Sequence, residues 1–354
     1  MLKKIFFAFL ASLLIAFSSH GLPVKHGFIS KAEAKSLKNV FQQVNPAVVV
    51  IVTKESGSSR LKTGKPVIKG GLGSGIVVSN EGLVMTAAHV VQMADEVKVF
   101  FLDGSQVTAK VVSSAQQADI ALLKLSYVPD NLQVAEFGDS DQVSIGDEVF
   151  IVGAPYGVDH TLTVGYLSGR RTSAGVCDQL TPIEFLQTDA SINMGNSGGP
   201  MFSMDGKLIG IVNHILSQSG GSEGLGFATS INTAKALLLE QKTFWIGLDV
   251  YLVSGDLAKA LNVPQEAGLL IQRVANESPG HKLGFRPGNI PIKIGRHKLL
   301  IGGDIVLEVQ GMPISVDIKK TCEIRDTMGG LGNEERIDFK VLRGGKIVNL
   351  YSSQ

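Results

Sequence analysis

The stretch Gly195-Asn196-Ser197-Gly198-Gly199-Pro200 places one serine among glycines. Glycine adopts backbone conformations that other residues resist, so this run can bend sharply and direct several N–H groups toward one point. Those N–H groups could hold an oxyanion, and the hydroxyl of Ser197 is the nucleophile that would create one. A glycine-rich surface turn would show the same letters. The choice between these readings depends on whether the chain also supplies a general base and an acid that orients it.

The composition favours a folded protein of two domains. The chain has 354 residues, of which 44% are hydrophobic and 18% charged, which is enough for sizeable cores. A formal net charge of +1 and scattered basic residues argue against a nucleic-acid partner. Many Val/Ile runs separated by Gly, Asn and Asp predict a mostly β fold with few helices. Since no His, Cys, Asp or Glu cluster has metal-ligand spacing, we expect no metal and no other cofactor.

The N-terminus has the pattern of an export signal. Lys3 and Lys4 precede an apolar run from Ile5 to Phe17, which is shorter than a membrane span. Ala16-Phe17-Ser18 offers small residues at the two positions that determine cleavage. We therefore expect a signal peptide and leader over residues 1–34 and export to the periplasm, with an uncleaved membrane anchor as the alternative.

The chain has two cysteines, Cys177 and Cys322. We place them in different domains and expect no disulfide between them. Neither has a neighbouring histidine or a CxxC partner, so neither is expected to be catalytic or to bind a metal.

Two apolar segments each carry one chemically useful side chain. The segment Thr86–Val91 ends a predicted strand with His89 between small and apolar residues, and Asp119 begins another predicted strand, Ile120–Leu125. A lone histidine is more often a core residue, and a strand-end aspartate is more often a turn or cap residue. A buried carboxylate, however, is unfavourable unless it has a partner such as an imidazole N–H.

In the order TAAHVV, DIALLKL and TDASINMGNSGGP, these segments resemble those of the trypsin-like serine proteases and, within them, the HtrA/DegP family of exported quality-control proteases. The resemblance runs from about residue 36 to the end. It implies a double β-barrel protease domain, which we place at residues 35–240. It also implies one role for each polar residue. The roles are nucleophile (Ser197), general base (His89), orienting acid (Asp119) and oxyanion donors through backbone N–H (Gly195 and Ser197, helped by Asn196).

The resemblance also implies a substrate pocket. Relatives that cleave after Lys or Arg carry an aspartate six residues before the nucleophile, where this chain has Ser191, so basic specificity is not expected. His214, Ile215 and Leu216 are placed along the pocket wall and imply a preference for Val, Ala, Leu or Ile.

Two residues depart from the family pattern. Val90 stands where secreted animal relatives carry a cysteine, and Met194 replaces the proline common before the glycine of the serine motif. Methionine is flexible, so the oxyanion loop could switch between active and inactive geometries, or Met194 could simply fill the position.

Residues 241–354 resemble a bacterial PDZ domain, which binds a C-terminal peptide as an added strand and captures its carboxylate with backbone N–H groups. The implied peptide-binding residues are Trp245, Ile246, Gly247, Leu248 and Val250, with a helix over Ile318–Met328 as the other wall. A plain core strand is the alternative for Trp245-Ile246. Residues 281–301 form a longer link than usual, with hairpin arms at 290–294 and 298–301 that could shield the groove or dock on the protease.

The sequence thus leads to an exported, ATP-independent serine endopeptidase that degrades unfolded or misfolded envelope proteins, with a PDZ domain for substrate capture or regulation. By resemblance, a homotrimer or higher homo-oligomer is expected. One alternative is a chaperone or peptide-binding scaffold with a vestigial triad. Another is a PDZ-gated signalling protease with one specific target.

Overall fold

The computed structural model describes residues 36–60, 66–154, 160–173, 182–215, 222–241, 243–295, 297–330 and 336–352. The predicted leader, residues 1–34, lies outside the described residues. None of the helices within the described ranges is long and apolar enough to cross a membrane.

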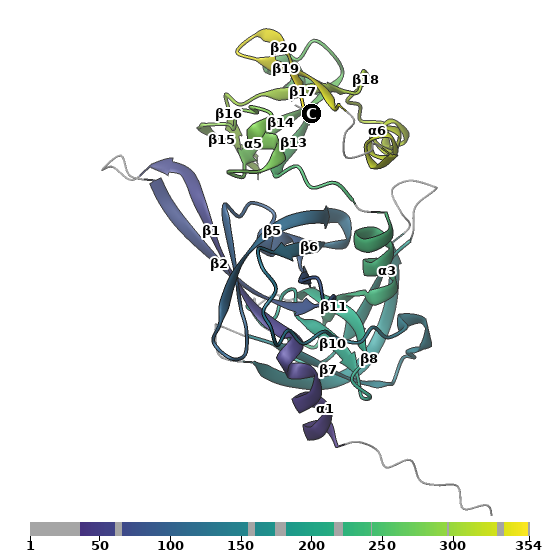
Figure 1. The fold of residues 1–354 in the computed structure, drawn as a ribbon. Coiled ribbons are helices and arrows are strands. Elements are labelled where there is room, and N and C mark those ends of the chain that lie inside the picture. The colour runs from purple at the N-terminus through teal and green to yellow at the C-terminus, as the bar shows by residue number, and fades with distance from the viewer. Residues whose placement is uncertain are drawn as a thin grey trace, which may run out of the picture. The chain divides into compact units, whose positions relative to one another are not determined.

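The strands within residues 48–125 form a closed six-stranded barrel (Figure 1). Its strands follow one another around the barrel in the order β1-β2-β3-β6-β5-β4. Buried side chains alternate with exposed ones along β5 from Gln106 to Ser113, as expected of a strand with one face on a core. The elements here are α1 (Leu37–Val44), η1 (Asn45–Ala47), β1 (Val48–Arg60), β2 (Pro66–Val77), β3 (Leu83–Thr86), α2 (Ala88–Val91), β4 (Glu96–Phe100), β5 (Gln106–Ala115), η2 (Gln116–Ala118) and β6 (Ile120–Leu125).

A second closed barrel follows, in the order β10-β11-β12-β9-β8-β7. Two six-stranded barrels confirm the predicted double-barrel, mostly β fold. The elements are η3 (Ser140–Gln142), β7 (Glu148–Gly153), β8 (Thr161–Ser173), β9 (Ile183–Thr188), β10 (Pro200–Ser203), β11 (Leu208–Ile215), β12 (Gly226–Ser230), α3 (Ile231–Lys235) and η5 (Ala236–Glu240).

Two local expectations from the sequence are wrong. The polar composition of residues 55–70 predicts a surface loop, but β1 and β2 extend into this segment, with Glu55 opposite Lys69. An antiparallel ribbon needs only its backbone ladder, so polar side chains do not prevent the extension. The residues around His89 are not the end of a strand, since they form the single helical turn α2.

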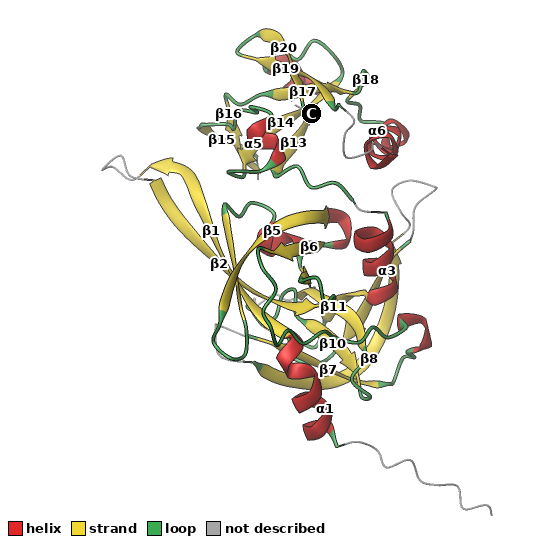
Figure 2. Cartoon of the chain, in the orientation of Figure 1, coloured by secondary structure: helices red, strands yellow, loops and turns green. Residues whose placement is uncertain are grey.

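The C-terminal region forms a separate antiparallel sheet with helices and one added hairpin (Figure 2). The strand order is β13-β14-β17-β19-β20, with β18 pairing β17, so β13 is an edge strand among the described residues. The elements are β13 (Leu248–Ser254), α4 (Gly255–Ala260), β14 (Ala267–Val274), α5 (Pro279–Lys282), β15 (Ile290–Ile294), β16 (His297–Ile301), β17 (Ile305–Val309), β18 (Met312–Pro313), α6 (Ile318–Gly330), β19 (Asp338–Arg343) and β20 (Lys346–Tyr351).

The expectation of no disulfide is also wrong, because Cys322 on α6 is disulfide-bonded. The other cysteine of the chain, Cys177, lies outside the described residues. Spacing along a chain does not report whether two Cα atoms come within the few ångströms that a disulfide needs. A disulfide is compatible with the predicted export, since exported proteins meet an oxidising environment.

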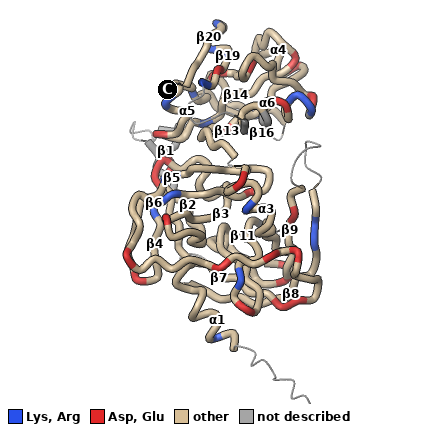
Figure 3. Tube along the Cα trace, turned by 45° about the vertical axis from the view of Figure 1, so that its right-hand side comes forward, with Lys and Arg blue, Asp and Glu red and all other residues tan. Residues whose placement is uncertain are grey.

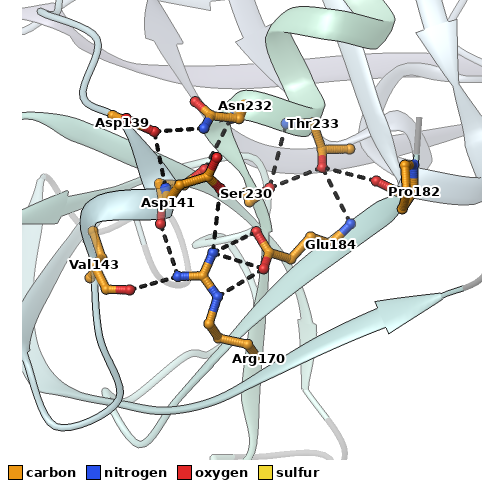
Figure 4. A network of polar contacts seen from close by, with 10 residues as sticks. Asp139, Asp141, Val143, Arg170, Pro182, Glu184, Ser230, Asn232 and Thr233 are labelled. Carbon is orange, nitrogen blue, oxygen red and sulfur yellow. Dashed lines mark hydrogen bonds and ion pairs between the residues drawn. The ribbon is translucent and has the colours of Figure 1, made fainter.

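A polar network centred on Arg170 holds the second barrel together (Figure 4). The Arg170 guanidinium on β8 donates from Nε and Nη2 to the two carboxylate oxygens of Glu184 on β9, at 2.8 and 2.9 Å. Its Nη1 donates to the backbone carbonyls of Ser140 and Val143, at 2.9 and 2.6 Å. A bidentate arginine–carboxylate pair fixes both strands to the neighbouring turn.

The same network continues to the start of α3 (Figure 4). Asn232 Nδ2 donates to Asp139 Oδ1 at 2.7 Å, and the Thr233 hydroxyl accepts from the backbone N–H of Glu184. The hydrogen bond from Asn232 is the main reason why the pKa of the Asp139 carboxyl is lowered. These contacts join strand, turn and helix into one polar support.

Candidate active site

His89 and Asp119 form a close pair between α2 and the start of β6. His89 Nδ1 lies 2.8 Å from Asp119 Oδ2, and the backbone N–H of His89 donates to Asp119 Oδ1 at 3.0 Å. An ionised carboxylate can only accept, so Nδ1 carries the proton and Nε2 presents a lone pair. Since the His89 side chain is half exposed, that lone pair can receive a proton from a neighbouring nucleophile.

The backbone of Asp119 is held in a conformation that few residues adopt. Its φ is 50°, in the left-handed region, where Asn and Asp are the commonest residues after glycine. Its carbonyl accepts from the Ala88 N–H at 3.2 Å and from Asn213 Nδ2 at 2.8 Å. These two bonds stabilise the turn that points the carboxylate at His89.

The loop before the nucleophile is a tight turn that requires a glycine. The N–H of Asn196 donates to the carbonyl of Asn193 at 3.0 Å, and Gly195 at the third position has φ of 102°. A positive φ at that position is characteristic of type II turns. Met194 occupies the second position with its side chain 73% exposed, so it does not fill a packed site.

From Gly195 to Gly199, two backbone N–H groups have no acceptor among the described residues, those of Gly195 and Ser197. The other three N–H groups of this stretch are paired. Asn196 donates to Asn193, Gly198 to Val212 and Gly199 to Asn196. The prediction that Asn196 helps to bind the oxyanion is therefore wrong, because the turn uses its N–H. The two free donors, Gly195 and Ser197, are the main oxyanion donors that the family resemblance implies.

Ser74 on β2 secures the loop from the first barrel. Its N–H donates to the Ser197 carbonyl at 2.8 Å and its hydroxyl to the Gly195 carbonyl at 2.7 Å. A Cβ on Gly198 would lie 2.4 Å from the Ser74 carbonyl and 2.2 Å from Thr86 Oγ1, so glycine is required for this close approach. Ser74 therefore holds the carbonyls of Gly195 and Ser197, the two residues whose N–H groups are free.

Asn213 on β11 contacts both the nucleophile and the orienting acid and was not predicted from the sequence. Ser197 Oγ donates to the Asn213 carbonyl at 3.2 Å, while the Asn213 amide nitrogen donates to the carbonyls of Ala118 and Asp119. Its amide oxygen accepts from the Thr229 hydroxyl at 3.0 Å. Asn213 is 1% exposed. A buried asparagine in a strand is unusual and was the available signal.

The structure describes only some of the predicted pocket residues. Ser191 is exposed. The backbones of His214 and Ile215 pair with Phe227 and Gly226 of β12, but their side chains, and all of Leu216, lie outside the described residues. The aliphatic pocket therefore stays a prediction.

Ile192, which follows the predicted pocket residue Ser191, is buried, and the sequence did not predict this. A Cβ on Gly226 would lie 2.4 Å from Ile192 Cδ1, and Ile192 is buried. Because Gly226 has no side chain, the side chain of Ile192, the residue after Ser191, can pack against it.

The predicted peptide-binding residues are divided between two surroundings. Ile246 and Leu248 pack in one cluster with Ile324 and Met328 of α6. Trp245 instead packs against the core of the first barrel, and its Nε1 donates to the Gln92 carbonyl at 3.4 Å. The structure therefore does not place Trp245 with the other members of the predicted groove.

Gly247, between Ile246 and Leu248, has a φ of 71°, a conformation that favours glycine. Val250 is 40% exposed on edge strand β13.

Neither the charge of the two barrels nor metal chemistry among the described residues points to a further site. Basic and acidic positions are interspersed along the barrels (Figure 3). No group of three or more His, Cys, Asp or Glu in these ranges could hold a metal ion.

Comparison with known proteins agrees with this geometry. A family model described as "Trypsin-like peptidase domain" matches residues 73–211, which include His89, Asp119 and Ser197. The structure of an HtrA-type protease, AlgW with a tripeptide, is 30% identical and covers 90% of this chain and 96% of its own, with a TM-score of 0.50. The chain belongs to the HtrA/DegP family of trypsin-like serine proteases. A second structure of the same relative, with a decapeptide, is 28% identical with a TM-score of 0.50 and covers 90% of this chain and 98% of its own.

Curated members of the HtrA/DegP family are similar over most of this chain. A protein of Pseudomonas putida and one of Halomonas elongata, both named "Probable periplasmic serine endoprotease DegP-like", are each 34% identical over 79% of this chain. This chain covers 55% of each of those proteins, so it spans about half the length of these relatives.

Proposed function

We propose that this chain is an exported serine endopeptidase that cleaves unfolded or misfolded proteins of the cell envelope. One observation carries the proposal. The N–H groups of Gly195 and Ser197 have no acceptor among the described residues, whereas those of Asn196, Gly198 and Gly199 are paired. Free donors next to a nucleophile, with the His89–Asp119 pair nearby, are what a tetrahedral oxyanion requires.

The proposed mechanism follows from these positions. The Ser197 hydroxyl turns from the Asn213 carbonyl toward His89 Nε2, loses its proton there and attacks the peptide carbonyl. The new oxyanion accepts from Gly195 and Ser197, each worth about 3–4 kcal/mol of barrier. His89 then donates its proton to the leaving amine, and Asp119 stabilises the imidazolium meanwhile. Water, activated by His89, hydrolyses the acyl-enzyme, so the proposed reaction needs no cofactor.

The site of action is proposed from two observations. The relatives are named as periplasmic, and this chain begins with the pattern of an export signal. We assign it to the periplasm on that basis. A homotrimer or higher homo-oligomer is proposed from family membership alone.

For the C-terminal sheet we propose a PDZ domain that binds C-terminal or extended peptides. Edge strand β13 has no partner on one side among the described residues, so a peptide could add to the sheet there. Ile246 and Leu248 pack with α6, which is the arrangement of a strand–helix groove. The left-handed φ of Gly247 suits a loop whose N–H groups capture a carboxylate.

Casein proteolysis by the wild type and by Ser197→Ala tests the proposal. We expect the wild type to digest denatured casein without added peptide and the variant to be inactive. Equal digestion by both would remove Ser197 from the mechanism. If neither digests casein, the result favours the alternative of a chaperone or peptide-binding scaffold with a vestigial triad. Activity that requires a C-terminal peptide would favour the gated signalling protease.

A further inference from the structure

The β15–β16 hairpin lies in a segment of unusual charge. Residues 278–303 contain the basic residues Lys282, Arg286, Lys293, Arg296 and Lys298 but no Asp or Glu, in a chain whose formal net charge is +1. No role in the proposed proteolysis or peptide capture uses this segment. The concentration of one sign of charge therefore needs its own explanation.

The hairpin exposes isoleucines as well as lysines. Ile290 and Ile294 on β15 are 53% and 44% exposed and lie on the same face of the strand. Lys293 points to the other face, directly opposite Lys298 of β16. Neither lysine has an ion-pair partner among the described residues. Like charges paired across two strands are unfavourable, so folding alone gives no reason for them.

The exposure is not a result of loose attachment. The buried amide of Gln272 on β14 accepts from the Leu300 N–H at 2.7 Å and donates to its carbonyl at 3.1 Å. Leu299 is buried, and the ring of His297 meets that of Tyr251 edge-on, with centroids 5.7 Å apart. Strand β16 is thus fixed to the sheet, and β15 is held out as the free outer strand.

We propose that this hairpin docks on an anionic lipid surface. Such a surface attracts basic side chains, and it accommodates apolar side chains in the boundary between headgroups and acyl chains. Lysines can reach the headgroups while their aliphatic stems stay in apolar surroundings. An acidic soluble protein would pair with the lysines but would give Ile290 and Ile294 no comparable environment. The combination of both groups on one free strand therefore favours the bilayer.

Sedimentation with lipid vesicles tests this proposal on the full chain. We would compare phosphatidylglycerol–phosphatidylcholine vesicles with pure phosphatidylcholine vesicles, at low and at high NaCl. Binding should need the anionic lipid and fall with salt. Lys293→Glu and Ile294→Ser should each weaken it by about fivefold or more.

The matched controls lie on strand β20 of the same region. Lys346 is exposed and Ile347 is 59% exposed, so Lys346→Glu and Ile347→Ser repeat both substitutions elsewhere. These controls should change binding by less than about twofold, since they lie outside the proposed surface. All four variants should digest casein like the wild type, which verifies that they fold.

Three results would overturn the proposal. Equal binding by all variants would assign lipid binding to another part of the chain, such as its apolar N-terminus. Weakening by Lys293→Glu but not by Ile294→Ser would indicate an acidic soluble partner. Stronger displacement by sodium phosphate than by NaCl of the same ionic strength would indicate a site for free phosphate.

Discussion

Two polar clusters of this protein differ in what they leave unpaired. Around Arg170, the guanidinium, the Glu184 carboxylate and two backbone carbonyls satisfy one another. Around Ser197, two N–H groups have no acceptor among the described residues, and the nucleophilic hydroxyl donates to a carbonyl that it must leave in order to react. The first cluster supports the barrel, and the second retains capacity for a substrate.

The difference shows how a site can be recognised from hydrogen bonds. Buried polar groups are almost always paired, so unpaired donors on a well-fixed loop call for a ligand. Ser74 and Asn213 fix the surroundings of the free donors, as Arg170 fixes the turn beside it. Breaking the second cluster should therefore reduce catalysis, and breaking the first should reduce stability.

Asp119→Asn should have the largest effect on activity. The amide no longer enforces the tautomer that leaves His89 Nε2 free, so we expect kcat on a peptide substrate to fall about 10,000-fold. The melting temperature should change little, because the backbone bonds around Asp119 remain. A fall of less than tenfold would show that the His89–Asp119 contact does not serve catalysis.

Arg170→Ala should instead lower stability. It leaves Glu184 without its partner in a half-buried site, and we expect the free energy of unfolding to fall by about 2 kcal/mol in urea titrations. Activity per folded molecule should be unchanged. Arg336→Ala removes an exposed pair with Asp338 and should cost less. Equal losses in the two variants would refute the structural role of the Arg170 network.

Asn213→Ala and Asn232→Ala make the same change, the first near Ser197 and the second in the Arg170 network. Asn213→Ala removes one of the bonds that hold the left-handed turn of Asp119. We expect kcat to fall about 10–100-fold with KM nearly unchanged, which is the sign of an interaction that matters in the transition state. Asn232→Ala should leave kcat unchanged. Equal effects of the two variants on kcat would contradict the distinction.

Met194→Pro should raise activity modestly. Proline is favoured at the second position of a type II turn, and the Met194 N–H donates no hydrogen bond among the described residues. A stabilisation of about 0.5–1 kcal/mol would raise kcat/KM by about two- to fivefold if the wild-type loop also populates inactive geometries. Met194→Ala is the control for loss of the side chain. An unchanged rate would mean that the wild-type turn is already fully formed.

Asn232→Ala should have the smallest effect, visible in the pH dependence of stability. The folded-state pKa of Asp139 is lowered mainly by Asn232, so this bond stabilises the fold above the ordinary carboxyl pKa, near 4. That contribution is lost as the pH falls through the lowered pKa. The variant should therefore be slightly less stable than the wild type at pH 6 but equally stable once Asp139 is protonated in both, as measured by urea titration. A pH-independent difference would assign the effect to packing.

The sequence predicts a triad because each proposed member stands in a short, distinctive segment, and the structure pairs two of them, His89 and Asp119. It also predicted the double barrel and the arms of the added hairpin, since these follow from alternation and family resemblance. Asn213 was missed because its importance lies in contacts with Asp119 and Ser197, which are distant along the chain. The disulfide at Cys322 was missed for the same reason.

The exclusion of Asn196 from the oxyanion donors could not be predicted either. Asn196 lies between the two donors Gly195 and Ser197, so the sequence gives no reason to exclude it. Only the hydrogen bond to the Asn193 carbonyl shows that the Asn196 N–H is already used. Individual backbone N–H directions depend on the turn that forms, and the letters of a glycine-rich loop permit several turns.

Labelling with a fluorophosphonate, followed by peptide mass spectrometry, tests the central claim most directly. An activated serine next to free oxyanion donors should be phosphonylated. We expect one adduct per chain, on Ser197, that is lost in Ser197→Ala and forms much more slowly in Asp119→Asn. No adduct, or an adduct on a different serine, would contradict the assignment of Ser197 as the nucleophile.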